Sequence, residues 1–295
     1  MSFILDPVDS PYRVPFDGSF AVANADTTPN EAMAKAGKKA HKKALKNTIE
    51  RMSELQQALY AHDRWSLLLV FQAMDAAGKD GTIRRVMTGL NPAGCQVSSF
   101  KKPSSEDLDH DFLWRVNKRL PERGRIGIFN RSHYEDVLVV RVHPEYLGGH
   151  RLPRDPSPES VFEGRYASIR DWEHHLARSG TVVLKFWLNV SYEEQRGRFL
   201  DRIAEPESRW KFNAGDVAER RRWKDYMSAY EKALNETSRP WAPWFSIPAD
   251  DKPFMRRAVS DIIVSTMERM APTFPSVDKD DAAEMKRLAK ELAGD

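Results

Sequence analysis

A strand, a glycine-containing loop and a helix follow one another between Ser66 and Met87, and this succession constrains the fold more than any other feature. The apolar run 66–71 predicts a buried strand, and the sequence from Thr82 onward has the pattern of a helix. Between them stands Met74-Asp-Ala-Ala-Gly-Lys-Asp-Gly81. In such a layout the backbone N–H groups of the loop and the helix N-terminus face an anion, and a lysine adds a positive charge. The segment therefore predicts a phosphate-binding loop in an α/β protein.

The loop departs from the standard pattern at two positions. Ala73 stands where the first glycine is usual, and Asp80 replaces the serine or threonine whose hydroxyl normally contacts Mg²⁺. Asp75 places a carboxylate among N–H groups that suit anions, and it would repel phosphate unless a divalent cation lay between the two. We therefore interpret Asp75 as a Mg²⁺ ligand, with Asp80 binding the ion directly or through water. The alternative is a glycine-containing turn whose aspartates only cap the next helix, but the strand–loop–helix context favours the binding loop.

The remaining chain alternates strands with helices. Several strand-like runs are continuously apolar, which indicates burial on both faces and favours a parallel sheet with helices on both sides. The predicted fold is therefore α/β, with a doubly wound five-stranded parallel sheet. We divide the chain into an extended arm at 1–30, one domain at 31–272 and a charged tail at 273–295. The expected strands are 66–72, 95–100, 125–130, 181–189 and 244–248, and the expected helices are 31–62, 82–89, 106–120, 159–178, 191–204, 216–236 and 252–271.

Composition restricts the cellular setting. Charged residues make up 30% of the 295 residues, the mean hydropathy is −0.61, and no apolar run reaches the ~18 residues of a membrane span. The first residues lack the basic and apolar regions of a secretion signal. Cys95 is the single cysteine, so no internal disulfide can form. We expect a cytoplasmic protein that does not interact with membranes.

A second polar cluster follows the third expected strand. Ligands bind at the carboxyl ends of strands in an open parallel sheet, and Asn130 occupies the place where an acidic metal ligand is usual. Arg131 suits bidentate phosphate contacts, and Glu135 or Asp136 could supply the missing carboxylate. His133 is interpreted as structural or substrate-orienting, because a phosphate acceptor oxygen is already largely deprotonated near neutral pH and needs no general base.

A basic helix and the segment after it resemble the lid of small phosphotransferases. Arg198 and Arg202 lie on one helix face, and basic residues recur at 211–216 and 219–224. Such lids close over the transferred group, exclude water and stabilise its negative charge. The competing interpretation is a solvated basic face whose arginines pair with neighbouring glutamates. We expect the lid at about 200–230.

Three motifs carry a resemblance to a known family: 74–81, Asn130-Arg-Ser-His-Tyr-Glu135 and Trp210-Lys-Phe-Asn-Ala-Gly-Asp216. Together they resemble the family-2 polyphosphate kinases from about Ala34 to Met270. The Asn-Arg-Ser form is similar to the subgroup called class III, which phosphorylates nucleoside mono- and diphosphates. The resemblance implies a P-loop kinase-like core of the thymidylate-kinase type with a helical lid. It implies reversible transfer of the terminal phosphoryl group of inorganic polyphosphate, converting AMP to ADP and ADP to ATP.

The resemblance also implies cofactors, assembly and residue roles. It implies Mg²⁺, with Mn²⁺ as a substitute, and a homo-oligomer that is a dimer or a tetramer. The implied catalytic residues are Asp75, Lys79, Arg131 and Arg198, with Arg196 and Arg202 as alternatives to Arg198. The implied metal ligands are Asp75 and Glu135, and the implied nucleotide contacts are Asn130, Arg131 and Glu135. The implied phosphate and polyphosphate contacts are Ala76, Ala77, Gly78, Lys79, Asp80, Gly81 and Lys211.

Two other functions compete with this interpretation. An ATP-dependent nucleotide kinase of the thymidylate-kinase-like type would favour a Gly-x4-Gly-Lys-Ser/Thr loop, which the sequence lacks. A nucleotide-dependent switch or a nucleic-acid binder would show an Asn-Lys-x-Asp motif or basic residues interleaved with aromatic ones, and the sequence shows neither. The expected partners are therefore inorganic polyphosphate and purine nucleotides, without nucleic acid. Preference for AMP or ADP, and for adenine or guanine, stays open.

Overall fold

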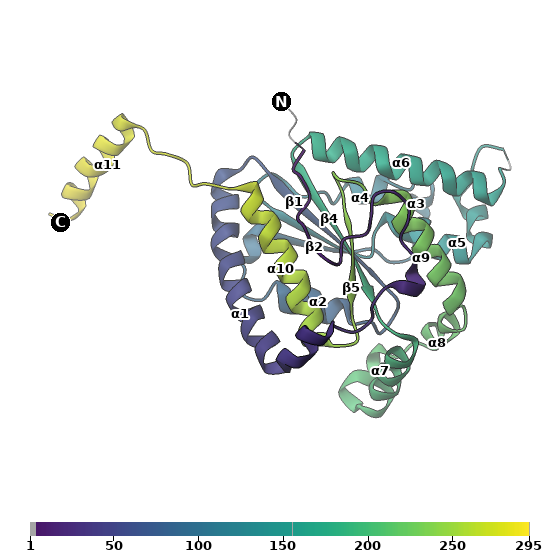
Figure 1. The fold of residues 1–295 in the computed structure, drawn as a ribbon. Coiled ribbons are helices and arrows are strands. Elements are labelled where there is room, and N and C mark those ends of the chain that lie inside the picture. The colour runs from purple at the N-terminus through teal and green to yellow at the C-terminus, as the bar shows by residue number, and fades with distance from the viewer. Residues whose placement is uncertain (1–3, 155, 295) are drawn as a thin grey trace.

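The computed structural model describes residues 4–154 and 156–294, apart from the side chains of Ser208 and Lys211. Its centre is a five-stranded sheet in the order β2-β3-β1-β4-β5, and every adjacent pair of these strands is parallel (Figure 1). The predicted α/β fold with a five-stranded parallel sheet is therefore confirmed. The strands are β1 (Ser66–Ala73), β2 (Cys95–Ser99), β3 (Ile126–Asn130), β4 (Thr181–Asn189) and β5 (Trp244–Pro248).

The central strands are buried because nearly all of their side chains are apolar. β1 lies between β3 and β4, and Leu69 of β1 pairs in register with Ile128 and Leu184, which are both buried. Phe71 of β1 stacks on Phe186 of β4, with ring centroids 5.1 Å apart. Apolar side chains on both faces of a sheet require cover on both sides, which the alternation of strands and helices provides.

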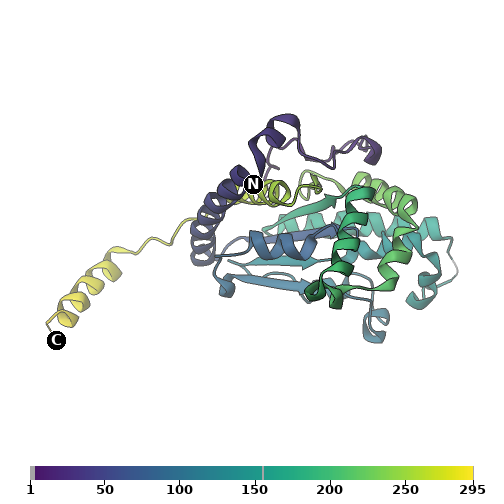
Figure 2. The same ribbon diagram turned by 90° about the horizontal axis from the view of Figure 1, so that it is seen from below.

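Helices cover both faces of the sheet, as Figures 1 and 2 show. α1 (Glu31–His62), α2 (Lys79–Val86) and α10 (Lys252–Met270) lie on one face, and α10 packs against both α1 and α2. α6 (Pro158–Arg178) and α9 (Trp223–Thr237) lie on the other face and contact each other. The sheet is therefore doubly wound, as the alternation of elements predicts.

Two predicted helices are shorter in the structure. The segment at 106–120 forms only α3 and α4, because the Asp111 carboxylate accepts a hydrogen bond from Leu113 N (2.9 Å) and starts a new turn between them. The segment at 216–236 divides into α8 and α9, because Arg222 has a non-helical backbone (φ −93°, ψ 22°). The divided segments are α3 (Ser105–Leu108), α4 (Trp114–Asn117) and α8 (Ala214–Arg220), with α9 as given above. The remaining elements are α5 (Val139–Val142), α7 (Tyr192–Ala204), η1 (Val22–Asn24), η2 (Pro92–Gly94), η3 (His133–Asp136), η4 (Pro144–His150) and η5 (Pro206–Lys211).

The N-terminal arm covers the free edge of β5. Val14 N donates to Trp244 O (2.9 Å) and Ser246 N donates to Tyr12 O (2.8 Å), so a short antiparallel pairing continues the sheet. Open strand edges promote pairing between molecules, and this cover blocks it. At the other end of the chain, α11 (Lys279–Leu292) stands clear of the body in both views (Figures 1 and 2). Within the described residues, no helix combines the length and apolar character needed to cross a membrane.

Candidate active site

The loop between β1 and α2 makes a sharp turn. Gly78 has a φ of +99°, which L side chains rarely adopt, and α2 begins at the next residue, Lys79. Ala76 also has a positive φ of +61°, so the backbone beside the glycine is strained. The first N–H groups of a helix have no partner within it, so those of α2 are available to an anion at the loop.

The Lys79 ammonium lies among charges of both signs. Its pKa is lowered to about 8, first by burial and then by repulsion from Arg131, while Glu135, Asp80 and Asp75 oppose the shift. A phosphate at this point would stabilise the protonated lysine, because it would replace lost solvation and offset the repulsion. These five side chains form one electrostatic cluster beyond the carboxyl ends of β1 and β3.

Direct contacts join the loop to the segment after β3. Asn130 Nδ2 donates to Asp80 Oδ1 at 2.7 Å, and Arg131 Nη2 donates to Asp75 Oδ1 at 3.0 Å. Arg131 Nη1 also lies 4.0 Å from Glu135 Oε2. Arg131 also has a φ of +63°, a strained backbone conformation for a residue with a side chain. The structure thus brings the predicted loop residues and the predicted residues after β3 into one site.

The sequence predicts that Asp75 and Glu135 hold a metal ion. Among the residues that the structure describes, no group of three or more histidine, cysteine, aspartate or glutamate side chains is arranged to bind one. The two carboxylates instead flank the Arg131 guanidinium. Mg²⁺ is usually bound by one or two carboxylates, with water and substrate phosphates completing its shell. Asp75 and Glu135 fit such a shared site, but they do not form an all-protein cage.

Arg198 is 6% exposed, and its guanidinium is hydrogen-bonded to the protein. Nη1 donates to Ala77 O and Nη2 donates to Ala249 O, both at 2.6 Å. Nε donates to Glu194 Oε1 at 2.8 Å. The side chain therefore braces the loop carbonyls against the segment after β5. This placement differs from that of a lid arginine projecting over the transferred group, and a contact of Arg198 with phosphate stays a prediction.

The two alternatives to Arg198 are also paired. Arg196 Nη1 lies 3.5 Å from Glu193 Oε2 at the surface, and Arg202 Nη1 lies 3.2 Å from Asp216 Oδ2. Lys211, the predicted polyphosphate contact, ends η5, and its side chain lies outside the described part of the structure. In this conformation Arg196, Arg198 and Arg202 are each bound to protein groups.

Gln195, which is not among the predicted site residues, connects the lid to the loop. It is buried in α7, and its Nε2 donates to Asp75 O at 2.8 Å. Arg220 of α8 donates from Nη1 to Gln195 Oε1 and to Tyr192 O, both at 2.7 Å. These contacts join α8 to the backbone of the phosphate-binding loop. No sequence signal separates this glutamine from the other polar residues of its helix.

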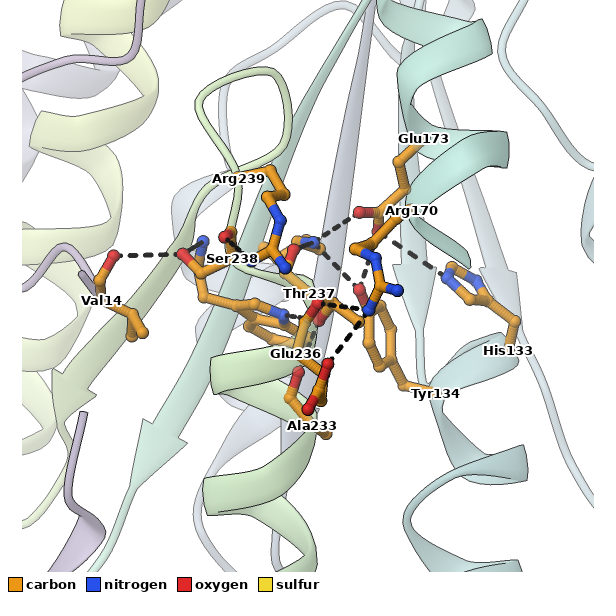
Figure 3. A network of polar contacts seen from close by, with 12 residues as sticks. Val14, His133, Tyr134, Arg170, Glu173, Ala233, Glu236, Thr237, Ser238 and Arg239 are labelled. Atoms are coloured by element: carbon orange, nitrogen blue, oxygen red, sulfur yellow. Dashed lines mark hydrogen bonds and ion pairs between the residues drawn. The ribbon is translucent and has the colours of Figure 1, made fainter. Parts of the chain in front are cut away.

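A buried network anchors η3, the turn that carries Glu135 (Figure 3). Lys185 of β4 donates from Nζ to Glu173 Oε2 (2.6 Å), and also to Tyr134 OH (2.9 Å). The same ammonium donates to Thr237 O (2.8 Å), and Tyr134 OH donates to Glu173 Oε1 (2.8 Å). Burial lowers the pKa of Lys185 to about 8, so the lysine is protonated at neutral pH. This network is not predictable from the sequence, because a lysine within an apolar strand does not reveal its partners.

His133 lies beside that network in η3. It is fully buried, and burial lowers its pKa, so the ring is neutral at pH 7. Its ring packs against Trp172, with centroids 4.7 Å apart. A buried neutral ring held by aromatic contacts is consistent with a structural role.

Comparison with known proteins identifies the family. Residues 35–275 match the sequence model described as Polyphosphate kinase 2. The chain belongs to the polyphosphate kinase 2 family. The chain is 53% identical over 249 residues to the ADP-polyphosphate phosphotransferase of Rhodopseudomonas palustris. The aligned residues cover 84% of this chain and 86% of that protein. The AMP/ADP-polyphosphate phosphotransferase of Meiothermus ruber is 45% identical to the chain over 264 residues, which cover 90% of this chain and 94% of that protein.

A solved structure supports the same assignment. The crystal structure of Polyphosphate Kinase 2 from Arthrobacter aurescens TC1 superposes with a TM-score of 0.86 at 36% identity. The superposition covers 97% of this chain and 100% of that one. The P-loop kinase-like core expected from the sequence is therefore the fold of a polyphosphate kinase 2 enzyme.

Proposed function

We propose that this family member phosphorylates nucleotides with inorganic polyphosphate in the cytoplasm. It transfers the terminal phosphoryl group of polyphosphate to AMP, giving ADP, and to ADP, giving ATP, in a reversible reaction. The family match and the activities named for the relatives from R. palustris and M. ruber support the proposal. The observation that carries it is the Arg131–Asp75 pair, 3.0 Å apart, beside Lys79 in the loop.

The site offers positive charge and N–H donors to a chain of phosphates. Lys79 and the N-terminus of α2 would bind the terminal phosphates of the donor. Arg131 would exchange its bond to Asp75 for phosphate oxygens, which it can contact with two parallel hydrogen bonds. The freed Asp75 carboxylate and Glu135 would hold Mg²⁺, or Mn²⁺ in its place. When bound, the ion neutralises phosphate charge and orients the reacting groups.

No general base is assigned to the reaction. The acceptor phosphate of AMP or ADP is already largely ionised near pH 7, so its oxygen can attack without losing a proton to the protein. The protein then acts mainly by aligning donor and acceptor and by neutralising charge on the transferred group. Asn130, which ends β3, and Glu135 of η3 are the residues proposed to contact the acceptor nucleotide.

Nucleotide product analysis tests the function directly. Purified protein is incubated with Mg²⁺, polyphosphate and one of AMP, ADP, GMP or GDP, and the products are separated by chromatography. We expect ADP and ATP to form with polyphosphate and to be lost in the Lys79→Ala and Asp75→Asn variants. Robust phosphorylation with ATP as donor, and none with polyphosphate, would replace this proposal with an ATP-dependent nucleotide kinase. Omitting Mg²⁺ and restoring it, or adding Mn²⁺, tests the cofactor in the same assay.

We also propose that the protein is a homo-oligomer, either a dimer or a tetramer. The family resemblance supports this, and the C-terminal tail exposes apolar side chains that a second copy could cover, namely Phe274, Val277, Met285, Leu288 and Leu292. Light scattering during size-exclusion chromatography measures the mass. A single species near the chain mass of 33.8 kDa at every concentration would contradict the proposal.

A further inference from the structure

Tyr230, in the middle of α9, packs at the carboxyl end of the sheet. Its side chain is 3% exposed, and its ring stacks on Trp187 of β4 with centroids 5.2 Å apart. Trp187 pairs in register with Gln72 of β1, and Gln72 Nε2 donates to Oγ of Ser132, the residue before η3, at 3.3 Å. Asp75 follows Gln72 by three residues. Tyr230 therefore lies at the level where the phosphate-binding loop and η3 leave the sheet.

Three charged residues of the candidate site act on the Tyr230 hydroxyl. Burial raises the pKa of Tyr230, the charges of Glu135 and Asp75 raise it further, and Arg131 opposes the shift. The pKa of Arg131 is in turn raised by Glu135 first, and then by Asp75 and Tyr230, against the effect of burial. Coulombic interactions weaken with distance, so the hydroxyl belongs to the same cluster as these three side chains. It is protonated at neutral pH and can donate a hydrogen bond.

Within residues 4–154 and 156–294, the Tyr230 hydroxyl has no hydrogen-bond partner. Two neighbouring tyrosines behave differently. Tyr226, one turn earlier in α9, donates to Glu219 Oε2 at 2.6 Å, and Tyr134 donates to Glu173 Oε1 at 2.8 Å. A buried tyrosine usually finds a partner for its hydroxyl, so an unpaired one needs an explanation. At the edge of a site for phosphate compounds, the simplest explanation is that the substrate is the partner.

The face of the sheet on which Tyr230 lies indicates which substrate it meets. α9 covers the same face as α6, whereas α2, whose N-terminus is proposed to bind the donor, covers the opposite face (Figure 1). The carboxylate with the largest effect on the hydroxyl is Glu135, which is proposed to contact the acceptor. A neutral O–H group can donate to a phosphate oxygen without adding negative charge beside two carboxylates. These features match the phosphate of the acceptor nucleotide.

We propose that the Tyr230 hydroxyl donates a hydrogen bond to the terminal phosphate of the acceptor nucleotide and so positions the attacking oxygen. The inference rests on the proposed function and adds to it an acceptor-binding residue on α9. The bond is present in the bound acceptor as well as in the transition state, so it should lower the acceptor KM without raising kcat. The donor does not touch the hydroxyl, so the KM for polyphosphate should be independent of it.

The test compares Tyr230→Phe with the wild-type enzyme. The matched control is Tyr166→Phe, because Tyr166 of α6 is also buried and its hydroxyl has no partner among the described residues. After burial, the groups that shift the pKa of Tyr166 are Arg141, Glu159 and Glu236, and none of them is a predicted site residue. Both substitutions keep the ring and remove no hydrogen bond seen in the structure, so both variants should fold, and an unchanged thermal midpoint verifies this. Initial rates are measured with each substrate varied in turn, and AMP and ADP binding without donor is measured by titration calorimetry.

In Tyr230→Phe we expect KM and Kd for the acceptor to rise about tenfold, the loss of one hydrogen bond to a charged group. The kcat and the KM for polyphosphate should stay at the wild-type values, as all parameters should in Tyr166→Phe. An unchanged acceptor KM and Kd would overturn the role of Tyr230, and so would equal rises in the KM of both substrates or a loss of kcat alone. A wild-type enzyme that forms no product from polyphosphate would overturn the proposed function itself, before any variant is compared.

Discussion

The Lys185 network allows a quantitative prediction about stability. Lys185 and Glu173 are both fully buried, and their charged atoms lie 2.6 Å apart. Lys185→Met removes the ammonium and leaves the Glu173 carboxylate without a compensating charge. Breaking a buried ion pair in this way costs about 3–5 kcal/mol. We therefore expect the free energy of unfolding to fall by about 3–5 kcal/mol, which is a large share of the ~5–15 kcal/mol that a domain typically has.

A second substitution separates the pair from its individual members. Lys185→Met combined with Glu173→Leu removes both charges, so no unpaired ion stays in the interior. Apolar replacement of a whole buried pair is often neutral or stabilising, although here Tyr134 and Thr237 also lose a donor. We expect the double variant to be more stable than Lys185→Met by about 1–3 kcal/mol, a clear departure from additivity.

Urea unfolding followed by tryptophan fluorescence measures these values. The control is Lys232→Met, because Lys232 forms a partly exposed pair with Glu236 at 3.2 Å. Such a pair contributes about 0–1 kcal/mol, so this variant should differ little from wild type. A loss below about 1 kcal/mol for Lys185→Met would refute the reasoning, and so would a double variant whose loss equals the sum of the losses in Lys185→Met and in Glu173→Leu alone.

Three further predictions concern the loop and the single cysteine. Because the pKa of Lys79 is about 8, kcat/KM for polyphosphate should fall as pH rises through about 8, where the free enzyme loses this proton, and the residual activity of Lys79→Arg should show no such fall. Arg198→Lys should lower the free energy of unfolding by about 2–3 kcal/mol, because it loses charge-assisted hydrogen bonds to buried carbonyls. A loss of kcat with an unchanged urea midpoint would instead indicate a purely catalytic arginine. Burial raises the pKa of the Cys95 thiol to about 11. At pH 8 the native thiol should therefore react with a disulfide reagent on the order of 100-fold more slowly than the thiol of the urea-unfolded protein. Equal rates would contradict the burial of Cys95.

The sheet could be predicted from the sequence because its strands carry their own signal. Continuous apolar runs such as 181–189 identify strands buried on both faces, and the structure has a strand over the same residues. The segment at 106–120 could not be predicted as well, since two short helices are separated by a local contact of the Asp111 side chain. A helical period over a few residues does not reveal where a polar side chain diverts the backbone.

The meeting of the loop with the residues after β3 was also predictable in outline. β1 pairs with β3 in parallel, with Phe71 opposite Asn130, so the segments that leave both strands must emerge side by side. Their specific partners were not predictable. The Gln195–Asp75 contact and the Lys185–Glu173 contact join different elements, and their formation depends on how α7 and α6 pack on the sheet. Sequence spacing carries no information on such packing.

Arg198 shows why residue type alone does not determine a role at this site. A guanidinium has five N–H donors, and a buried one must find acceptors for most of them. An irregular loop leaves carbonyl groups without regular secondary-structure partners, and Arg198 meets both needs by donating to Ala77 O and Ala249 O. The positive charge of Arg198 also repels cations that it does not contact, because it contributes to lowering the pKa of both Lys252 and Arg256. An arginine that braces the loop therefore also adds to the positive potential around Lys252 and Arg256. For this reason Arg198→Lys, which keeps the charge but not the planar fork, should lower the free energy of unfolding while largely retaining the positive potential beside Lys252.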